Sequence, residues 1–290
     1  MLATRRSPLA LAQTELVAAR LRAAGHEPEP LPLTTTGDRW SAADRAPAPD
    51  RGLFVKELEE ALLDGRAHLA VHSAKDLPGE LTPGLAVVAV PPREDPRDVL
   101  VGPEAGLEGL AAGARVATGS PRRAAQVLAA RPDVEIVPIR GNVGTRLEKL
   151  ARGEADALVL AAAGLRRLGL WPRGTTPLPA GVCTPAPGQG LLAVEGRAGD
   201  AEVAEAAAAL DDPSAHACLR AERAFLQALG GGCMRPVGAL CAAEGDRLAL
   251  IAFAGTEDGR AVERAARDGF AAEPEALGRE AAAALSALSR

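Results

Sequence analysis

The chain has 290 residues, 47% of them hydrophobic and 24% charged, which is typical of a folded globular protein and excludes a disordered or fibrous one. This length predicts about two domains and allows a third. The formal net charge of −5 argues against a nucleic acid or an anionic membrane as a partner recruited by overall charge, although a local basic site remains open.

The first part of the chain alternates strand-like apolar runs with helical patterns, which is typical of an α/β domain with a largely parallel sheet. Ser7, Pro8 and Gly25 mark where the first helix is capped, begins and ends. The cluster 91–96 holds three prolines, which favour extended backbone, so we predict a hinge there. The elements predicted before it are strands at 1–4, 67–72 and 85–90 and helices after Ser7 and near 54–64.

After the hinge the same scheme restarts. The elements predicted here are strands at 115–118, 135–139 and 157–161 and helices from Ser120 and at 143–152. Segments 3–8 and 117–123 both combine a strand end, a serine cap, a proline in the first helical turn and paired arginines. A helix start offers unpaired N–H groups and a partial positive charge, so its expected guest is a carboxylate or a phosphate. One copy alone would be a capping device with solvated arginines, but two matching copies favour anion binding.

The last third begins with a Pro-rich stretch, 172–187, that leads through Gly188-Gln189-Gly190 into a predicted strand at 191–195. We expect this strand to return the chain to the first domain. A long helix from Asp212 to Leu229, a strand at 248–254 and a closing helix from Glu273 then predict a small α+β domain. The predicted domains are 1–91 with 188–210, 96–184, and 212–290.

Cys233 follows three glycines after the long helix, so a thiol is held in an adaptable loop. A free cysteine is more often a small buried hydrophobe, but the glycines would let this sulfur carry a bulky adduct. No histidine or acid stands beside it in the sequence to activate it for hydrolysis. A permanent attachment point is therefore favoured over a turnover nucleophile.

The segment from His72 to Pro78 comes directly after a strand, where loops of open α/β sheets line the ligand crevice. Asp76 is its candidate for stabilising positive charge or managing protons. A turn cap before a proline is the alternative for Asp76, and His72 is better explained as a packed residue at a strand end.

Arg122, Arg123, Arg140 and Arg146 gather around two predicted helix starts, with the hydroxyls of Thr118 and Ser120 nearby in the sequence. The planar guanidinium suits carboxylate or phosphate recognition. A solvated basic face is the alternative, weakened by the two glycines that lie between Arg140 and Arg146. The residues thus predict a cleft between α/β domains that binds a polyanion.

The stretch after Arg5 and Arg6 has an apolar run that ends at Gln13, which is too short for an export signal, and no apolar run is long enough to cross a bilayer. The four cysteines lack the spacing of zinc sites and are too few for a disulfide framework. We therefore predict no metal and a cytoplasmic location.

These segments, in this order, resemble the porphobilinogen deaminase (hydroxymethylbilane synthase) family over essentially the whole chain. The matching motifs are Ala3-Thr4-Arg5 with Ser7-Pro8-Leu9-Ala10 and Gln13, Thr36-Gly37-Asp38, 52–57, 72–78, Gly119-Ser120 with Arg122-Arg123, 140–146, Gly188-Gln189-Gly190 and Gly232-Cys233. Each motif is moderately specific, and the ordered set is highly specific.

The resemblance implies that Cys233 carries a dipyrromethane cofactor in thioether linkage and that four porphobilinogens are condensed on it into hydroxymethylbilane. It implies that Asp76 stabilises the azafulvenium cation formed when ammonia leaves, and that Phe54 lies near the cofactor ring. It implies a monomer of two periplasmic-binding-protein-like α/β domains and a small α+β domain. Cofactor binding is implied for Asp76, Lys75, Ser73, Arg122, Arg123, Thr118, Ser120 and Gly119. Substrate binding is implied for Arg5, Ser7, Gln13, Phe54, Arg140, Arg146 and Gln189.

One segment departs from the family pattern, because the Pro-rich stretch 45–51 replaces a glycine- and lysine-bearing loop. Arg51 can substitute for one of the lysines, and the other has no counterpart. A solute-binding protein that closes two α/β domains on an anion is the rival interpretation, but it would have no use for Gly232-Cys233.

Overall fold

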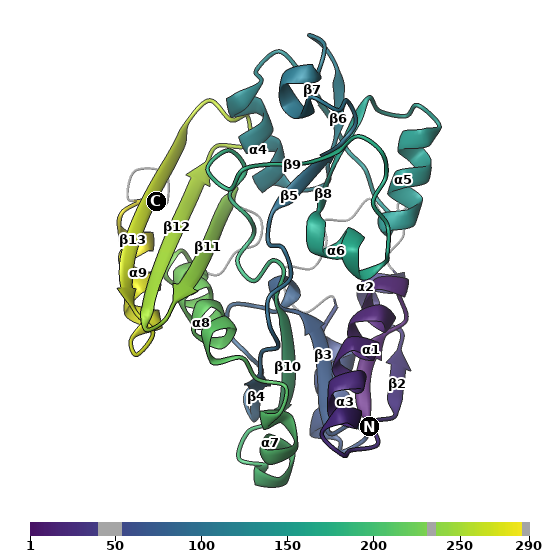
Figure 1. Cartoon of the computed structure of the whole chain (residues 1–290), viewed down its shortest axis with the longest axis vertical. Helices are drawn as coiled ribbons and strands as arrows, with labels where there is room; N and C mark the ends of the chain where they lie inside the picture. The colour runs from purple at the N-terminus through teal and green to yellow at the C-terminus, as the bar shows by residue number, and fades with distance from the viewer. Residues whose placement is uncertain (40–53, 231–235, 286–290) are drawn as a thin grey trace.

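The computed structural model describes residues 1–39, 54–230 and 236–285, which form two five-stranded sheets and one three-stranded sheet (Figure 1). Cys233 and the departing segment 45–51 lie outside the described residues. The predicted architecture of two α/β units and one small α+β unit is confirmed. None of the helices described is long and apolar enough to span a membrane.

The first unit is built on the sheet β2-β1-β3-β10-β4, the lower one in Figure 1. Ser7 accepts a hydrogen bond from the Ala10 N–H and caps α1, as its position before Pro8 predicts. The elements are β1 (Leu2–Arg5), α1 (Pro8–Ala23), β2 (Pro30–Leu33), α2 (Thr36–Arg39), α3 (Lys56–Leu63), β3 (Leu69–Ser73), a short 3₁₀ helix η1 (Ala74–Asp76), β4 (Leu85–Ala89), β10 (Leu192–Arg197) and α7 (Ala201–Ala208).

The second unit uses the sheet β7-β6-β8-β5-β9, at the top of Figure 1. Ser120 caps α4 and Asn142 caps α5, each through its side-chain oxygen. The elements are β5 (Asp98–Val101), a 3₁₀ helix η2 (Gly106–Gly109), β6 (Arg115–Ala117), α4 (Pro121–Ala130), β7 (Glu135–Val137), α5 (Val143–Ala151), β8 (Ala157–Ala161), α6 (Ala162–Arg167) and β9 (Thr175–Pro177).

Both sheets are mixed, which corrects the prediction of largely parallel ones. β1 pairs in parallel with β2 and β3, but β10 runs antiparallel to both β3 and β4. β5 likewise runs antiparallel to β8 and β9. The reason is the connection between the units, since the chain leaves the first sheet after β4, enters the second at β5, and later returns as β10.

The two connecting segments lie against each other and are tied by the Glu94 N–H, which donates to the Gly190 carbonyl at 3.1 Å. Gly190 has a φ of +86°, and a side chain there would collide with the Glu94 carbonyl. Gly188 has a φ of +77° and packs against the backbone of Ala74 and Lys75. The two glycines therefore let the Gly-Gln-Gly segment approach the hinge on one side and the turn after β3 on the other.

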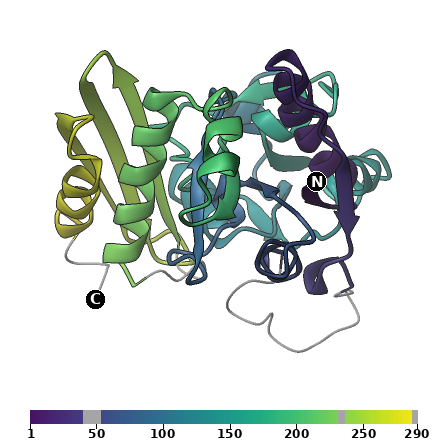
Figure 2. The same cartoon turned by 90° about the horizontal axis from the view of Figure 1, so that it is seen from below.

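The third unit places α8 and α9 on one face of the antiparallel sheet β11-β12-β13 and stands beside the other two (Figure 2). Glu222 of α8 is fully buried and joins it to the hinge, since it accepts from Arg93 Nη1 at 2.6 Å and from the Gly188 N–H at 2.6 Å. The elements are α8 (Pro213–Ala228), β11 (Val237–Glu244), β12 (Arg247–Gly255), β13 (Val262–Phe270) and α9 (Pro274–Ala283).

Candidate functional site

Two neighbouring cavities lie beside α1 and the end of β3 in the first unit. The first, of about 50 Å³, is lined by Asp76 and residues of the first unit, and we call it the Asp76 cavity. The second, of about 90 Å³, lies between the two units, and we call it the cleft cavity. Leu9, Gln13 and Ser73 line both, so the two cavities adjoin.

Asp76 ends η1, the single 3₁₀ turn that directly follows β3. It is exposed, and it lines its cavity together with Arg5, Ser7 and Phe54. The turn after β3 thus lines a cavity at the place where the sequence predicts a ligand crevice. A carboxylate at the wall of a small cavity is suited to stabilising a cation within it.

Two contacts hold Arg5 at the rim of the Asp76 cavity. Its Nη2 donates to Asp38 Oδ1 at 2.5 Å, and its guanidinium lies over the Phe54 ring at 4.0 Å from the centroid. Its Nε is buried and has no hydrogen-bond partner among the described residues. Because a buried N–H normally has a partner, this Nε marks a place for an acceptor from a ligand.

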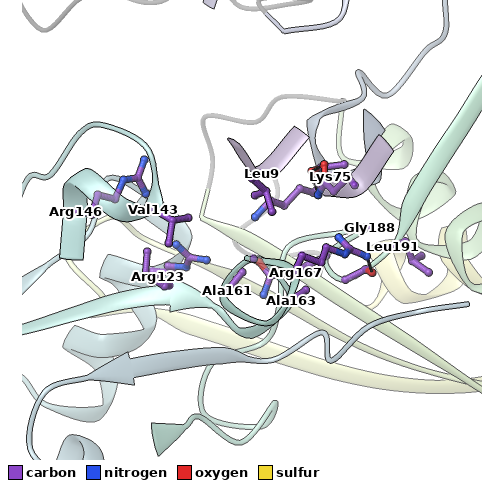
Figure 3. A pocket seen from close by; sticks show the side chains of 16 residues that line it. Leu9, Lys75, Arg123, Val143, Arg146, Ala161, Ala163, Arg167, Gly188 and Leu191 are labelled. Atoms are coloured by element: carbon purple, nitrogen blue, oxygen red, sulfur yellow. Dashed lines mark hydrogen bonds between the residues drawn. The ribbon is translucent and has the colours of Figure 1, made fainter. Parts of the chain in front are cut away.

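The cleft cavity is cationic. Figure 3 shows Lys75 extending from one wall, Arg123 and Arg146 on the opposite side, and Arg167 near Gly188. Burial, with the neighbouring Arg123, lowers the pKa of Lys75 to about 8. Burial and Arg123 also lower the pKa of Arg146, and burial lowers that of Arg167 to about 10. Four crowded cations indicate a site that an anionic ligand would stabilise.

Asp98, at the start of β5, gathers the two arginines of α4. Its Oδ2 accepts from Arg122 Nη1 at 2.6 Å and its Oδ1 from Arg123 Nε at 2.9 Å. Burial alone would raise the pKa of Asp98, but the two guanidinium groups hold it well below its usual range. Arg123 still lines the cleft cavity, whereas Arg122 is not among the lining residues and also donates to the Thr184 carbonyl.

Two predicted glutamines connect the cavities to the fold. Gln13 Nε2 donates to Ser73 Oγ at 2.8 Å, which ties α1 to the end of β3. Gln189 Nε2 donates to Asp98 Oδ1 at 3.0 Å, while its Oε1 is buried without a partner in the described part of the chain. Gln189 lines the cleft cavity, so this oxygen is available to accept a hydrogen bond from a donor of a ligand.

Other predicted site residues do not reach these two cavities. Thr118 accepts from the Ser120 N–H, and Ser120 caps α4, so both shape the helix start that presents Arg123. Gly119 lies close to the Ile139 carbonyl, where a Cβ would be 2.8 Å away. Arg140 is exposed and its carbonyl accepts from Lys149. Cys233 lies outside the described residues.

The sequence analysis missed three residues of this site. Arg167, at the end of α6, lines the cleft cavity and donates to the Gly190 carbonyl at 2.7 Å. Asp98 orients the arginines of α4, and Asp38 holds Arg5. Arg167 follows the strand β8 by one short helix, and that position after a strand end was the available signal.

Comparison with known proteins gives two family matches. Residues 1–205 match the family described as "Porphobilinogen deaminase, dipyromethane cofactor binding domain", and residues 216–287 match "Porphobilinogen deaminase, C-terminal domain". The chain is 51% identical to the porphobilinogen deaminase of Roseiflexus castenholzii over 278 residues, which cover 95% of this chain and 91% of that protein. It is 49% identical to that of Stenotrophomonas maltophilia, with 97% and 94% covered.

Among solved structures, the periplasmic VFT2 domain of Bordetella pertussis BvgS is similar at 17% identity and a TM-score of 0.38, covering 67% of this chain and 74% of that one. A similarity this distant carries no information about function.

Proposed function

Because this chain belongs to the porphobilinogen deaminase family and carries its dipyrromethane cofactor binding domain, we propose that each porphobilinogen reacts in the Asp76 cavity and that the cleft cavity holds the growing product. The observation that supports this division is the charge of the two cavities. The first presents the carboxylate of Asp76 opposite a single arginine, Arg5, whereas the second is lined by Lys75 and three arginines and, among the described residues, by no carboxylate.

Asp76 is proposed to act on a cation. The aminomethyl group reacts in its protonated, ammonium form: when its C–N bond breaks, the bonding electrons leave with the nitrogen as neutral ammonia, and porphobilinogen becomes an azafulvenium cation. A pyrrole α-carbon then forms the new C–C bond, and its hydrogen is released as a proton that ammonia can take up. The Asp76 carboxylate would stabilise the cation electrostatically, and its position beside the exposed rim would let ammonia escape.

Anion recognition is proposed for the residues around both cavities. Each pyrrole carries an acetate and a propionate, so every addition brings two carboxylates. The free Nε of Arg5, with the hydroxyl of Ser7 nearby, suits a carboxylate of the incoming substrate in the Asp76 cavity. Phe54 would stack near the reacting ring. Lys75, Arg123, Arg146 and Arg167 suit the carboxylates of the chain already made.

The cleft residues also fit the dipyrromethane, which brings four carboxylates and two N–H donors. The cations Lys75 and Arg123 and the unpartnered Gln189 Oε1 match these two kinds of group, while Ser73 lies between the cavities. When bound, the dipyrromethane supplies a free pyrrole α-carbon for the first addition. Cys233 is proposed as its point of attachment. We propose that four residues contribute to cofactor binding indirectly, by orienting α4 and Arg123: Thr118, Gly119, Ser120 and Arg122. Arg140 is proposed to contact later pyrroles.

We further propose that the enzyme is a transferase, hydroxymethylbilane synthase, which acts as a cytoplasmic monomer without nucleic-acid or membrane partners. The net charge of −5 supports the absence of nucleic-acid and membrane partners. The free thiols of Cys183, Cys218 and Cys241 support a cytoplasmic location. For the domains we propose 1–91 with 188–210, 96–184 and 212–290, a division supported by the strands that each sheet contains.

Intact-mass measurement of the purified protein tests the proposal. We expect an excess equal to two pyrrole units, located on Cys233 by peptide mapping and absent from Cys233→Ser. Addition of porphobilinogen should extend the adduct in steps of one further pyrrole unit. An unmodified wild-type chain that merely binds a small anion would contradict the attachment and favour the solute-binding interpretation.

A further inference from the structure

Asp38 is the ion-pair partner of Arg5 within the described part of the chain, and it is itself held by further hydrogen bonds. While its Oδ1 accepts from Arg5, its Oδ2 accepts from the Thr35 N–H at 3.1 Å and from Thr35 Oγ1 at 2.8 Å. Thr35 is fully buried, so the carboxylate keeps its orientation without help from Arg5. Burial alone would raise the pKa of Asp38, but its bonds to Arg5 and Thr35 hold it below the usual range.

A second acid fixes the same region from the other side. Glu57 Oε1 in the first turn of α3 accepts from the N–H and the Oγ1 of Thr36, both at 2.7 Å. The start of α2, which carries Asp38, is thereby tied to the helix that begins just after Phe54. Arg5 is thus placed by three elements, with Asp38 on one edge, the Phe54 ring on one face, and the strand β1 behind it.

The unengaged edge of the guanidinium is what remains for a ligand. With Nη2 held by Asp38 and the plane held by Phe54, the Nε–H cannot rotate away from the interior where it is buried without a partner. An arginine held in this way binds a carboxylate without first losing rotamer freedom, which an unrestrained arginine side chain must lose on binding.

We propose that Asp38, secured by Thr35 and supported by Glu57, is a positioning residue that holds Arg5 ready for a carboxylate of the incoming porphobilinogen. Asp38 does not touch the substrate and takes no part in the bond-forming step. This inference rests on the proposed function of the Asp76 cavity. It implies that loss of Asp38 weakens capture of porphobilinogen and leaves the reaction of bound substrate nearly unchanged.

Steady-state kinetics and mass spectrometry of the holoenzyme, with its covalent cofactor in place, test this role. For Asp38→Ala we expect KM for porphobilinogen to rise about tenfold with kcat within about twofold, since one charged hydrogen bond that orients Arg5 is lost. Asp38→Asn keeps an acceptor for Arg5 and should restore much of the affinity. The concentration of porphobilinogen that half-saturates the first covalent adduct should shift in parallel with KM.

Asp133→Ala is the matched control, because it removes the partner of Arg131 in a surface ion pair of the second unit. Its KM should equal that of the wild type. A fall in KM for Asp38→Ala would mean that Asp38 competes with the substrate for Arg5, and would overturn the proposal. A lower melting temperature with unchanged KM would mean a structural role alone. If Arg5→Leu raises KM but Asp38→Ala does not, the positioning role of Asp38 alone is overturned. If the cofactor mass is present but Arg5→Leu leaves KM unchanged, the proposed substrate contact of Arg5 fails, and the role of Asp38 fails with it.

Discussion

Arg122 and Arg123 are neighbours in the sequence, and the same cofactor-binding role was predicted for both. In the structure both contact Asp98, but only Arg123 also lines the cleft cavity, while Arg122 continues inward to the Thr184 carbonyl. Adjacent residues of a helix point about 100° apart, so they seldom face the same surroundings. Both arginines could be recognised as candidates from the sequence. Their different roles could not, because these depend on contacts with Asp98, which belongs to a strand that had not been predicted.

Asp76→Asn should abolish most turnover while the fold is retained. The amide keeps the shape of the carboxylate but removes the negative charge that faces the cation, and electrostatic terms of this kind are worth about 3 kcal/mol or more. We expect kcat to fall at least about a hundredfold with an unchanged melting temperature. Turnover within a few-fold of the wild type would exclude the role proposed for Asp76.

Lys75 should make product-chain binding depend on pH. Its lowered pKa of about 8 means that it is charged below this value and loses the charge above it, so affinity for an anion falls as pH rises through 8. A bound anion would raise the pKa again. Between pH 7 and pH 9.5 we expect the wild-type Kd for a linear polypyrrole carboxylate to weaken about fivefold. Lys75→Arg should show a flat profile, and an equal slope in both proteins would assign the pH dependence to another group.

At the level of helices and strands, the caps were predictable because they depend on neighbouring residues. Ser7, Ser120 and Asp212 each cap the helix that follows them, as expected. Short strands were not predictable, because a few apolar residues carry too little pattern. β5 and β9, which complete the second sheet, were missed for this reason, and β9 also lies in a Pro-rich stretch.

The helix α5 offers a test at this scale, since Arg146 in its first turns lines the cleft cavity and Arg152 at its end is exposed and paired with Glu154. Arg146→Leu should stall elongation after a particular number of additions, because a charged hydrogen bond is worth roughly 1.5–3 kcal/mol and would be missed only once the chain reaches it. The ladder of covalent intermediates, resolved by mass, should then end at a different rung. Arg152→Leu should give the wild-type ladder. Equal ladders in both variants would remove α5 from the product path.

At the scale of the whole molecule, the three units meet around Arg93. Arg93 donates to the Gln189 carbonyl in the returning segment, to Glu222 of α8 and to the Cys241 carbonyl of β11. The sequence indicated a hinge at the prolines, and it indicated that the strand after Gly188-Gln189-Gly190 returns the chain to the first domain. It did not indicate that a single guanidinium joins them to the third unit, because the partners are far apart along the chain.

Glu222→Ala should weaken the contacts between the three units more than it destabilises the fold of any single unit. It leaves Arg93 largely buried without its carboxylate, a change that costs about 3–5 kcal/mol at such sites. We expect the melting temperature to fall by about 5–10 °C and limited proteolysis to cut first between the units. The surface pair partner Glu275, when changed to Ala, should shift the melting temperature by much less. Equal shifts would show that Glu222 adds nothing beyond a surface pair.

The antiparallel strand β10 also decides the order in which the chain can fold. β4 pairs with β10 alone, and β10 is synthesised after every strand of the second sheet. The first sheet therefore stays incomplete, with β3 unpaired along one edge, until β10 has been synthesised. The second sheet is continuous in the chain from β5 to β9 and has no such wait. Contacts between distant segments form slowly because the loop between them must first close. During refolding, the amides of β6 and β8 should therefore become protected from hydrogen exchange before those of β4, and a nascent chain that stops short of β10 would expose the unpaired edge of β3 to chaperones.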